Sequence, residues 1–92
     1  TRTDVYGADL LGWALHRSGQ DLAAAPFAAA ALAQHTRDGL LYYHAGMIAY
    51  TLGDTSLART RLTEALAINP RFAPFAADTA RTTLATLPVE RR

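Results

Sequence analysis

The stretch DGLLYYHAGMIAYTLGDTSLARTRLTEALAINP, residues 38–70, decides the fold. Asp38 is a suitable N-cap for a helix, and apolar side chains follow it at helical spacing. Gly53 ends this helix, because glycine readily adopts the left-handed conformation at a helix C-terminus. Asp54 caps a second helix, which the Asn-Pro pair at the end of the stretch stops. These signals together predict a hairpin of two helices.

The hairpin occurs twice, as the sequence shows when it is shifted against itself so that Asp4 falls on Asp38. The same shift places Gly12 on Gly46 and Gly19 on Gly53 without a gap. Further matches are Ala24 on Ala58, Ala31 on Ala65, Leu32 on Leu66 and Ala33 on Ala67. The first copy therefore predicts helices over 4–18 and 21–34. Its second helix is rich in alanines that predict a close approach of neighbouring helices: Ala24, Ala25, Ala28, Ala29 and Ala30.

A last helix is predicted over 74–87, where apolar and threonine side chains share one face and Pro88 ends the pattern. It has Ala80 and Leu87 at the positions where the two copies carry glycine. Since no segment alternates with the period of a strand, we expect an all-α fold. We expect an antiparallel helical-hairpin solenoid of about five helices. It forms one domain over 1–92, made of a repeat at 3–36, a repeat at 37–70 and a capping helix at 72–88.

A 34-residue helix–turn–helix unit with these residues resembles the tetratricopeptide repeat. The second copy carries the signature residues of that family in register: Tyr42, Ala45, Gly46, Ala49, Ala58, Leu62, Ala65 and Pro70. The resemblance covers about residues 3–70. The first copy departs from the pattern at Ala8 and Thr36, where the family usually has an aromatic residue and a proline.

The resemblance implies where helices meet and where a partner binds. Gly46 and Ala58 mark the closest approach within a hairpin, and Leu62 and Ala65 pack against the following helix. The leading helices line a concave face, to which the first copy contributes Tyr6, Asp9, Trp13, His16 and Arg17. The second copy contributes Leu40, Tyr43, Met47, Tyr50 and Thr51, and the last helix contributes Arg81. We expect a non-enzymatic scaffold that binds an apolar or aromatic segment of a partner protein or peptide there, with an acidic group near Arg17.

Two other roles remain open. An aromatic stripe at helical spacing also suits a core, so Trp13 and Tyr43 can simply pack against each other. The chain would then be a structural cap or spacer of a longer array that supports an enzymatic or regulatory domain elsewhere. The first helix also has no preceding hairpin in this sequence to cover it. We therefore expect further repeats upstream of Thr1 in a longer parent protein, or self-association as a homodimer.

Composition excludes several classes of function. The chain has 92 residues, with nine arginines, no lysine and eight acidic residues, so its net charge of +1 does not point to nucleic acid. No apolar run reaches the roughly 18 residues of a membrane span, and no signal segment is visible, so a cytoplasmic location is expected. The use of arginine alone and an alanine content of about a fifth indicate a GC-rich bacterial genome.

Chemistry that needs a cofactor or a nucleophile is not predicted either. The chain has no cysteine, and His16, His35 and His44 lack the spacing of a metal site. Ser18 and Ser56 stand at helix ends, where capping or solvent exposure explains them. No glycine-rich loop connects a strand to a helix, so no phosphate cradle is expected. We therefore expect no cofactor, no metal and no catalytic residues.

Overall fold

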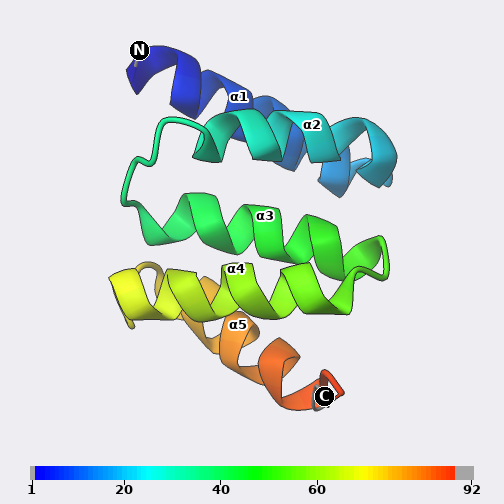
Figure 1. Ribbon diagram of the computed structural model, residues 1–92, viewed down its shortest axis with the longest axis vertical. Helices are drawn as coiled ribbons and strands as arrows, with labels where there is room; N and C mark the ends of the chain where they lie inside the picture. The colour runs from blue at the N-terminus through cyan, green and yellow to red at the C-terminus, as the bar shows by residue number, and fades with distance from the viewer. Residues whose placement is uncertain (1, 89–92) are drawn as a thin grey trace.

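The computed structural model describes the backbone of residues 2–88 and the side chains of residues 4–88. This part of the chain is helical, without a strand. Its helices are α1 (Arg2–Arg17), α2 (Asp21–Leu32), α3 (Gly39–Thr51), α4 (Thr55–Ile68) and α5 (Pro74–Thr86). α1 and α2 form one hairpin, α3 and α4 form a second, and α5 follows (Figure 1). The predicted all-α helical-hairpin fold is therefore confirmed.

The helix ends follow the local signals of the sequence. The carboxylates of Asp38 and Asp54 accept backbone N–H groups in the first turns of α3 and α4, at 3.0 and 3.1 Å. Gly19 and Gly53 have φ angles of +80° and +84° in the turns within the two hairpins. Glycine adopts this left-handed conformation without steric cost. The two turns are thus built in the same way, at equivalent points of the two copies.

Each hairpin closes on a leading-helix glycine. A Cβ atom built on Gly12 would lie 3.4 Å from the backbone nitrogen of Ala28. One built on Gly46 would lie 3.2 Å from the backbone nitrogen of Leu62. The shift that places Gly12 on Gly46 also places Ala28 on Leu62, so the two glycines occupy equivalent environments.

The prediction that Gly46 and Ala58 mark the closest approach within the hairpin is wrong in detail. The atoms nearest to Gly46 belong to Leu62 and not to Ala58, because the branched side chain of Leu62 covers the glycine. Ala58 lies further along the hairpin, in a cluster with Ala49. Leu62 and the carbonyl of Ala65 also approach α3 of their own hairpin, at Gly46 and Gly39 respectively. Both residues belong to the buried cluster that includes Ala80 of α5, the following helix.

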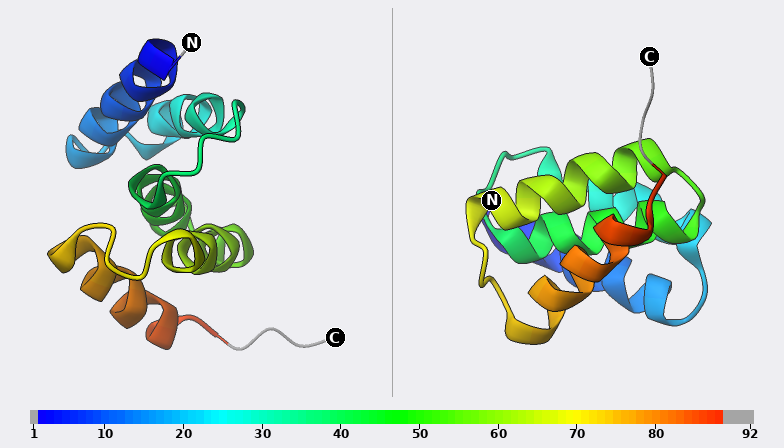
Figure 2. Two further views of the ribbon diagram at one scale, coloured as in Figure 1. Left: turned by 90° about the vertical axis from the view of Figure 1, so that its left-hand side faces the viewer. Right: turned by 90° about the horizontal axis from the view of Figure 1, so that it is seen from below.

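α3 is the central helix of the molecule. It contacts α1, α2, α4 and α5, and nine of its 13 residues are buried. Figure 2 (left) shows α1 and α5 on one side of α3, while α2 and α4 lie toward the other side. α1, α3 and α5 therefore share one face, called the leading-helix face below. None of the helices in the described part of the chain is long and apolar enough to cross a membrane.

Candidate functional site

The only tryptophan lies between two histidines on the leading-helix face. The ring of Trp13 stacks on His44 with 4.0 Å between centroids and 21° between planes. It also stacks on His16 at 4.7 Å and 29°. Tyr43 adds a tilted contact at 5.7 Å. Trp13 and Tyr43 thus pack against each other, as the structural interpretation of the aromatic stripe predicts.

Each of the two histidines is held by a carboxylate. His44 Nδ1 lies 2.8 Å from Asp9 Oδ1, and the two side chains are 11% and 12% exposed. His16 Nδ1 lies 2.5 Å from Asp21 Oδ1, in an equally sheltered position. The carboxylates fix the imidazole rings in place, so both rings hold the indole of Trp13 in one orientation. We call these five residues with Tyr43 the Trp13 cluster; it ties α1 to both α2 and α3.

The sequence prediction missed two members of the Trp13 cluster. It does not include His44, because this residue immediately follows Tyr43 and so points about 100° away on an ideal helix. It treats Asp21 only as the start of the second helix. A signal for His44 does exist, since it stands 35 positions after Asp9, one residue more than the repeat period. For Asp21 the signal is its position five residues after His16, across a glycine turn.

Tyr43 connects the three helices of the leading-helix face. Its ring contacts Trp13 on α1 and Phe72 just before α5, with 5.7 and 5.6 Å between centroids. The hydroxyl of Thr79 on α5, which donates to the Phe75 carbonyl at 2.9 Å, also acts on the Tyr43 hydroxyl. Burial raises the pKa of the Tyr43 hydroxyl above 10.0, while the Thr79 hydroxyl and the positive charge of Arg17 lower it by a smaller amount. The Tyr43 ring is therefore held in place on the leading-helix face, and its hydroxyl stays protonated at neutral pH.

The remaining predicted residues divide between packing and solvent. The Tyr6 hydroxyl donates to Asp38 Oδ2 at 2.9 Å, and Met47 Sδ lies 3.9 Å from Thr83 Oγ1 on α5. Tyr50 and Arg17 are exposed, and Arg17 forms no ion pair with any described residue. The structure thus brings Asp9, Trp13, His16 and Tyr43 into one cluster, while Tyr6 and Met47 hold α3 to its neighbours.

The other residues that the sequence predicts for the concave face are Leu40, Thr51 and Arg81, and they lie outside the Trp13 cluster. Leu40 is half-buried against the core. The Thr51 hydroxyl donates to the Met47 carbonyl at 3.0 Å, within α3. Arg81 pairs with Asp78 at 3.1 Å and donates to the Pro70 carbonyl at 2.5 Å, so it holds the segment before α5.

Two large apolar side chains are exposed on α1 and α5, the two helices that flank α3. Leu10 is 70% exposed, and helical spacing places it on the same side of α1 as Trp13. Phe75 is 89% exposed, one turn before Thr79, whose hydroxyl donates to the Phe75 carbonyl at 2.9 Å. Leu10 and Phe75 therefore lie on the two helices that flank Tyr43. The sequence prediction missed both residues, although their spacing from Trp13 and Thr79 could have indicated them.

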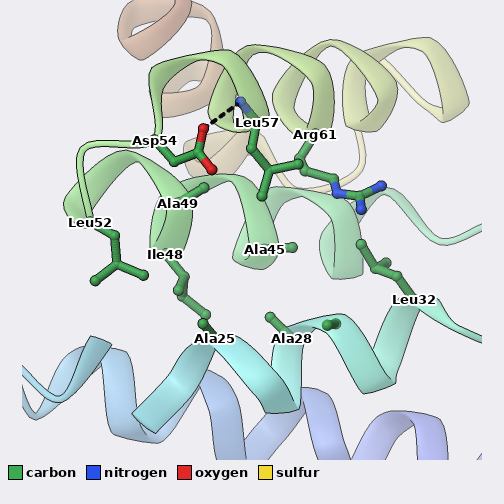
Figure 3. A pocket seen from close by; sticks show the side chains of 11 residues that line it. Ala25, Ala28, Leu32, Ala45, Ile48, Ala49, Leu52, Asp54, Leu57 and Arg61 are labelled. Carbon is green, nitrogen blue, oxygen red and sulfur yellow. Dashed lines mark hydrogen bonds between the residues drawn. The ribbon is translucent and has the colours of Figure 1, made fainter. Parts of the chain in front are cut away.

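A pocket of about 180 Å³ opens elsewhere, between α2, α3 and α4 (Figure 3). Ala25, Ala28 and Ala29 line its α2 wall, and Ile48 lies on the α3 wall. The predicted close approach of helices is found beside Gly12, where Ala28 packs. Toward α3 the same alanines leave space, because a methyl group does not fill the distance between two hairpins.

Comparison with known proteins finds no matching family model, no similar curated protein and no similar solved structure. Among the side chains that the structure describes, no three His, Asp or Glu residues are grouped so that they could hold a metal ion. The fold and the site thus define an all-α protein of two helical hairpins and a further helix, with an aromatic–histidine cluster on the leading-helix face.

Proposed function

We propose that this chain is a non-enzymatic protein-binding module, which holds an apolar or aromatic peptide segment on the leading-helix face. One observation carries the proposal: Leu10 and Phe75 are largely exposed on the two helices that flank the fixed ring of Tyr43. Large apolar side chains around a rigid aromatic centre are typical of the few residues that dominate binding at protein interfaces.

The Trp13 cluster supports the proposal by its rigidity. Its histidines have carboxylate partners and its rings are packed, so a partner that lies on this face meets a surface that is already ordered. Arg17 stands at the edge without an ion pair among the described residues, and an acidic group of the partner would find a charged hydrogen-bond donor there.

We further propose that the two hairpins are tetratricopeptide-like repeats. The equivalent environments of Gly12 and Gly46, and the equivalent turns at Gly19 and Gly53, support this assignment. In such an arrangement the leading helices present the binding face, which agrees with the position of the exposed apolar side chains.

Selection of peptides from a displayed library tests the proposal, with Trp13 emission as the readout of binding. We expect the selected peptides to shift Trp13 emission. Leu10→Ser and Phe75→Ser should each weaken binding at least tenfold, about 1.4 kcal/mol. Leu22→Ser is the matched control, because Leu22 is 82% exposed on α2, away from the leading-helix face. Binding that depends on Leu22 and not on Leu10 or Phe75 would contradict the proposal.

A structural role is the second candidate, and the burial of Tyr43 together with the stacking of Trp13 between two imidazoles favours it. In that case no selected peptide depends on Leu10 or Phe75, and Trp13 emission resists quenchers in solution. Self-association through the same exposed side chains is a third possibility, which a concentration-dependent mass in sedimentation would reveal.

A further inference from the structure

The pocket between α2, α3 and α4 differs from the leading-helix face in both position and chemistry. Its lining is aliphatic apart from two charged side chains, Asp54 and Arg61. Figure 3 shows these two at opposite ends: Asp54 lies with Leu52 at one end, and Arg61 extends from α4 toward Leu32 at the other. An apolar chamber with separated charges at its ends discriminates between ligands by both size and charge.

Asp54 and Arg61 are not equivalent in what they offer a ligand. Asp54 Oδ1 already accepts the backbone N–H of Leu57 at 3.1 Å, as the N-cap of α4. Arg61 makes no hydrogen bond or ion pair with any residue that the structure describes. A ligand anion would therefore be attracted to the Arg61 end and repelled from the Asp54 end, which sets its orientation in the pocket.

The packing of the hairpins does not itself require a cation at this position. Residue 61 corresponds to residue 27 in the alignment of the two copies, and residue 27 is a phenylalanine. The second hairpin therefore departs from the first by placing a guanidinium where the first has an aromatic ring. The departure lies at the mouth of a pocket that the first hairpin helps to form through Ala25 and Ala28.

The size of the pocket limits the ligand. A cavity of about 150 Å³ with aliphatic walls holds a molecule as large as benzene. The volume of about 180 Å³ here thus suits an alkyl group of about six carbons. A peptide end is less suitable, because its buried amide groups would need partners that aliphatic walls and internally bonded helices do not provide.

We propose that this pocket binds a short-chain aliphatic carboxylate, with the alkyl chain between α2 and α3 and the carboxylate on Arg61. This site is independent of the proposed function, which uses the opposite side of α3. The apolar area of such a ligand is small, so its dissociation constant should be about 1 mM.

Titration of the chain with sodium hexanoate, followed by amide chemical shifts, tests the proposal. We expect saturable shifts at Ala25, Ile48 and Leu52, weaker binding of hexan-1-ol, and no shifts with acetate. Arg61→Gln should weaken hexanoate binding about tenfold and leave hexan-1-ol unchanged. Arg71→Gln is the control with the same change of charge, because Arg71 lies outside this pocket.

A second pair of variants tests whether hexanoate lies against the α2 wall of the pocket. Ala29→Phe should fill the pocket and abolish the hexanoate shifts, whereas Ala23→Phe, on the same helix but outside the pocket, should not. The proposal is overturned if hexanoate gives no saturable shifts at the pocket residues, or if Arg61→Gln and Arg71→Gln have the same effect. Tighter binding of N-acetyl-leucine than of hexanoate at the same residues would instead assign the pocket to a peptide C-terminus.

Discussion

Gly12 and Gly46 each lie against the backbone of the opposite helix in their own hairpin, at points that the repeat makes equivalent on both helices. The contact leaves no room for a side chain at Gly46, where an added Cβ atom would come within 2.7 Å of Leu62 Cδ2. The repeat in the sequence is therefore a repeat in packing, and the glycine sets how closely the two helices approach.

Substitution of Gly46 tests this contact. Gly46→Leu should lower the free energy of unfolding by at least about 2 kcal/mol, because the new side chain must push α3 and α4 apart. Gly7→Leu is the control on α1, since nothing lies within 4 Å of a Cβ atom at Gly7. It should raise the free energy of unfolding by a few tenths of a kcal/mol through helix propensity. Urea unfolding measures both, and equal stability of the two variants would argue against the helix pairing.

The pair of Asp9 and His44 should stabilise the packing of α1 on α3. Because both side chains are sheltered, removal of either partner should cost about 1–3 kcal/mol. A double-mutant cycle with Asp9→Ala and His44→Ala should give a coupling free energy of at least about 0.5 kcal/mol. The exposed pair of Arg37 and Glu64, at 3.4 Å, is the control and should couple more weakly. A coupling at Asp9 and His44 no larger than that of the control would show that the pair does not hold the helices.

Alkaline pH should destabilise the fold through Tyr43. Its pKa is raised above 10.0 by burial, so the folded protein retains the phenolic proton at pH values where the unfolded chain loses it. The free energy of unfolding should therefore be constant below about pH 10 and fall as the pH rises above it. The stability of Tyr43→Phe should fall less in alkali, because phenylalanine has no phenolic proton to lose. Tyr50→Phe, at an exposed position, should keep the alkaline decrease of the unmodified protein.

His35 has a φ angle of 56°, the only positive value at a non-glycine residue in the described part of the chain. A side chain in this left-handed conformation costs about 1–2 kcal/mol, which glycine avoids. His35→Gly should therefore raise the free energy of unfolding by about 0.5–1 kcal/mol, after the higher conformational entropy that glycine gives the unfolded chain is subtracted. Thr36→Gly, next to it, should instead lower stability. Thermal unfolding compares the two, and a destabilised His35→Gly variant would contradict the argument from backbone strain.

Local chemistry made the helices and turns predictable. Asp38, Asp54 and the turn glycines act on their own neighbours in sequence, so the expected and observed helix ends differ by at most two residues. The bond between His44 and Asp9 was not predictable in the same way, because it depends on how α3 is rotated against α1. The pocket depends on the distance between hairpins, which the alanines of α2 do not determine by themselves.

The contact of Trp13 with His44 and Tyr43 tests the central claim most directly, because it exists only if α1 and α3 lie side by side on a shared face. Nuclear Overhauser effects between side-chain protons measure it, and the single tryptophan makes the indole signals unambiguous. We predict cross-peaks from the Trp13 indole protons to the ring protons of both His44 and Tyr43, whose centroids lie 4.0 and 5.7 Å away. A folded, helical protein without these cross-peaks would contradict the stacking of the two hairpins.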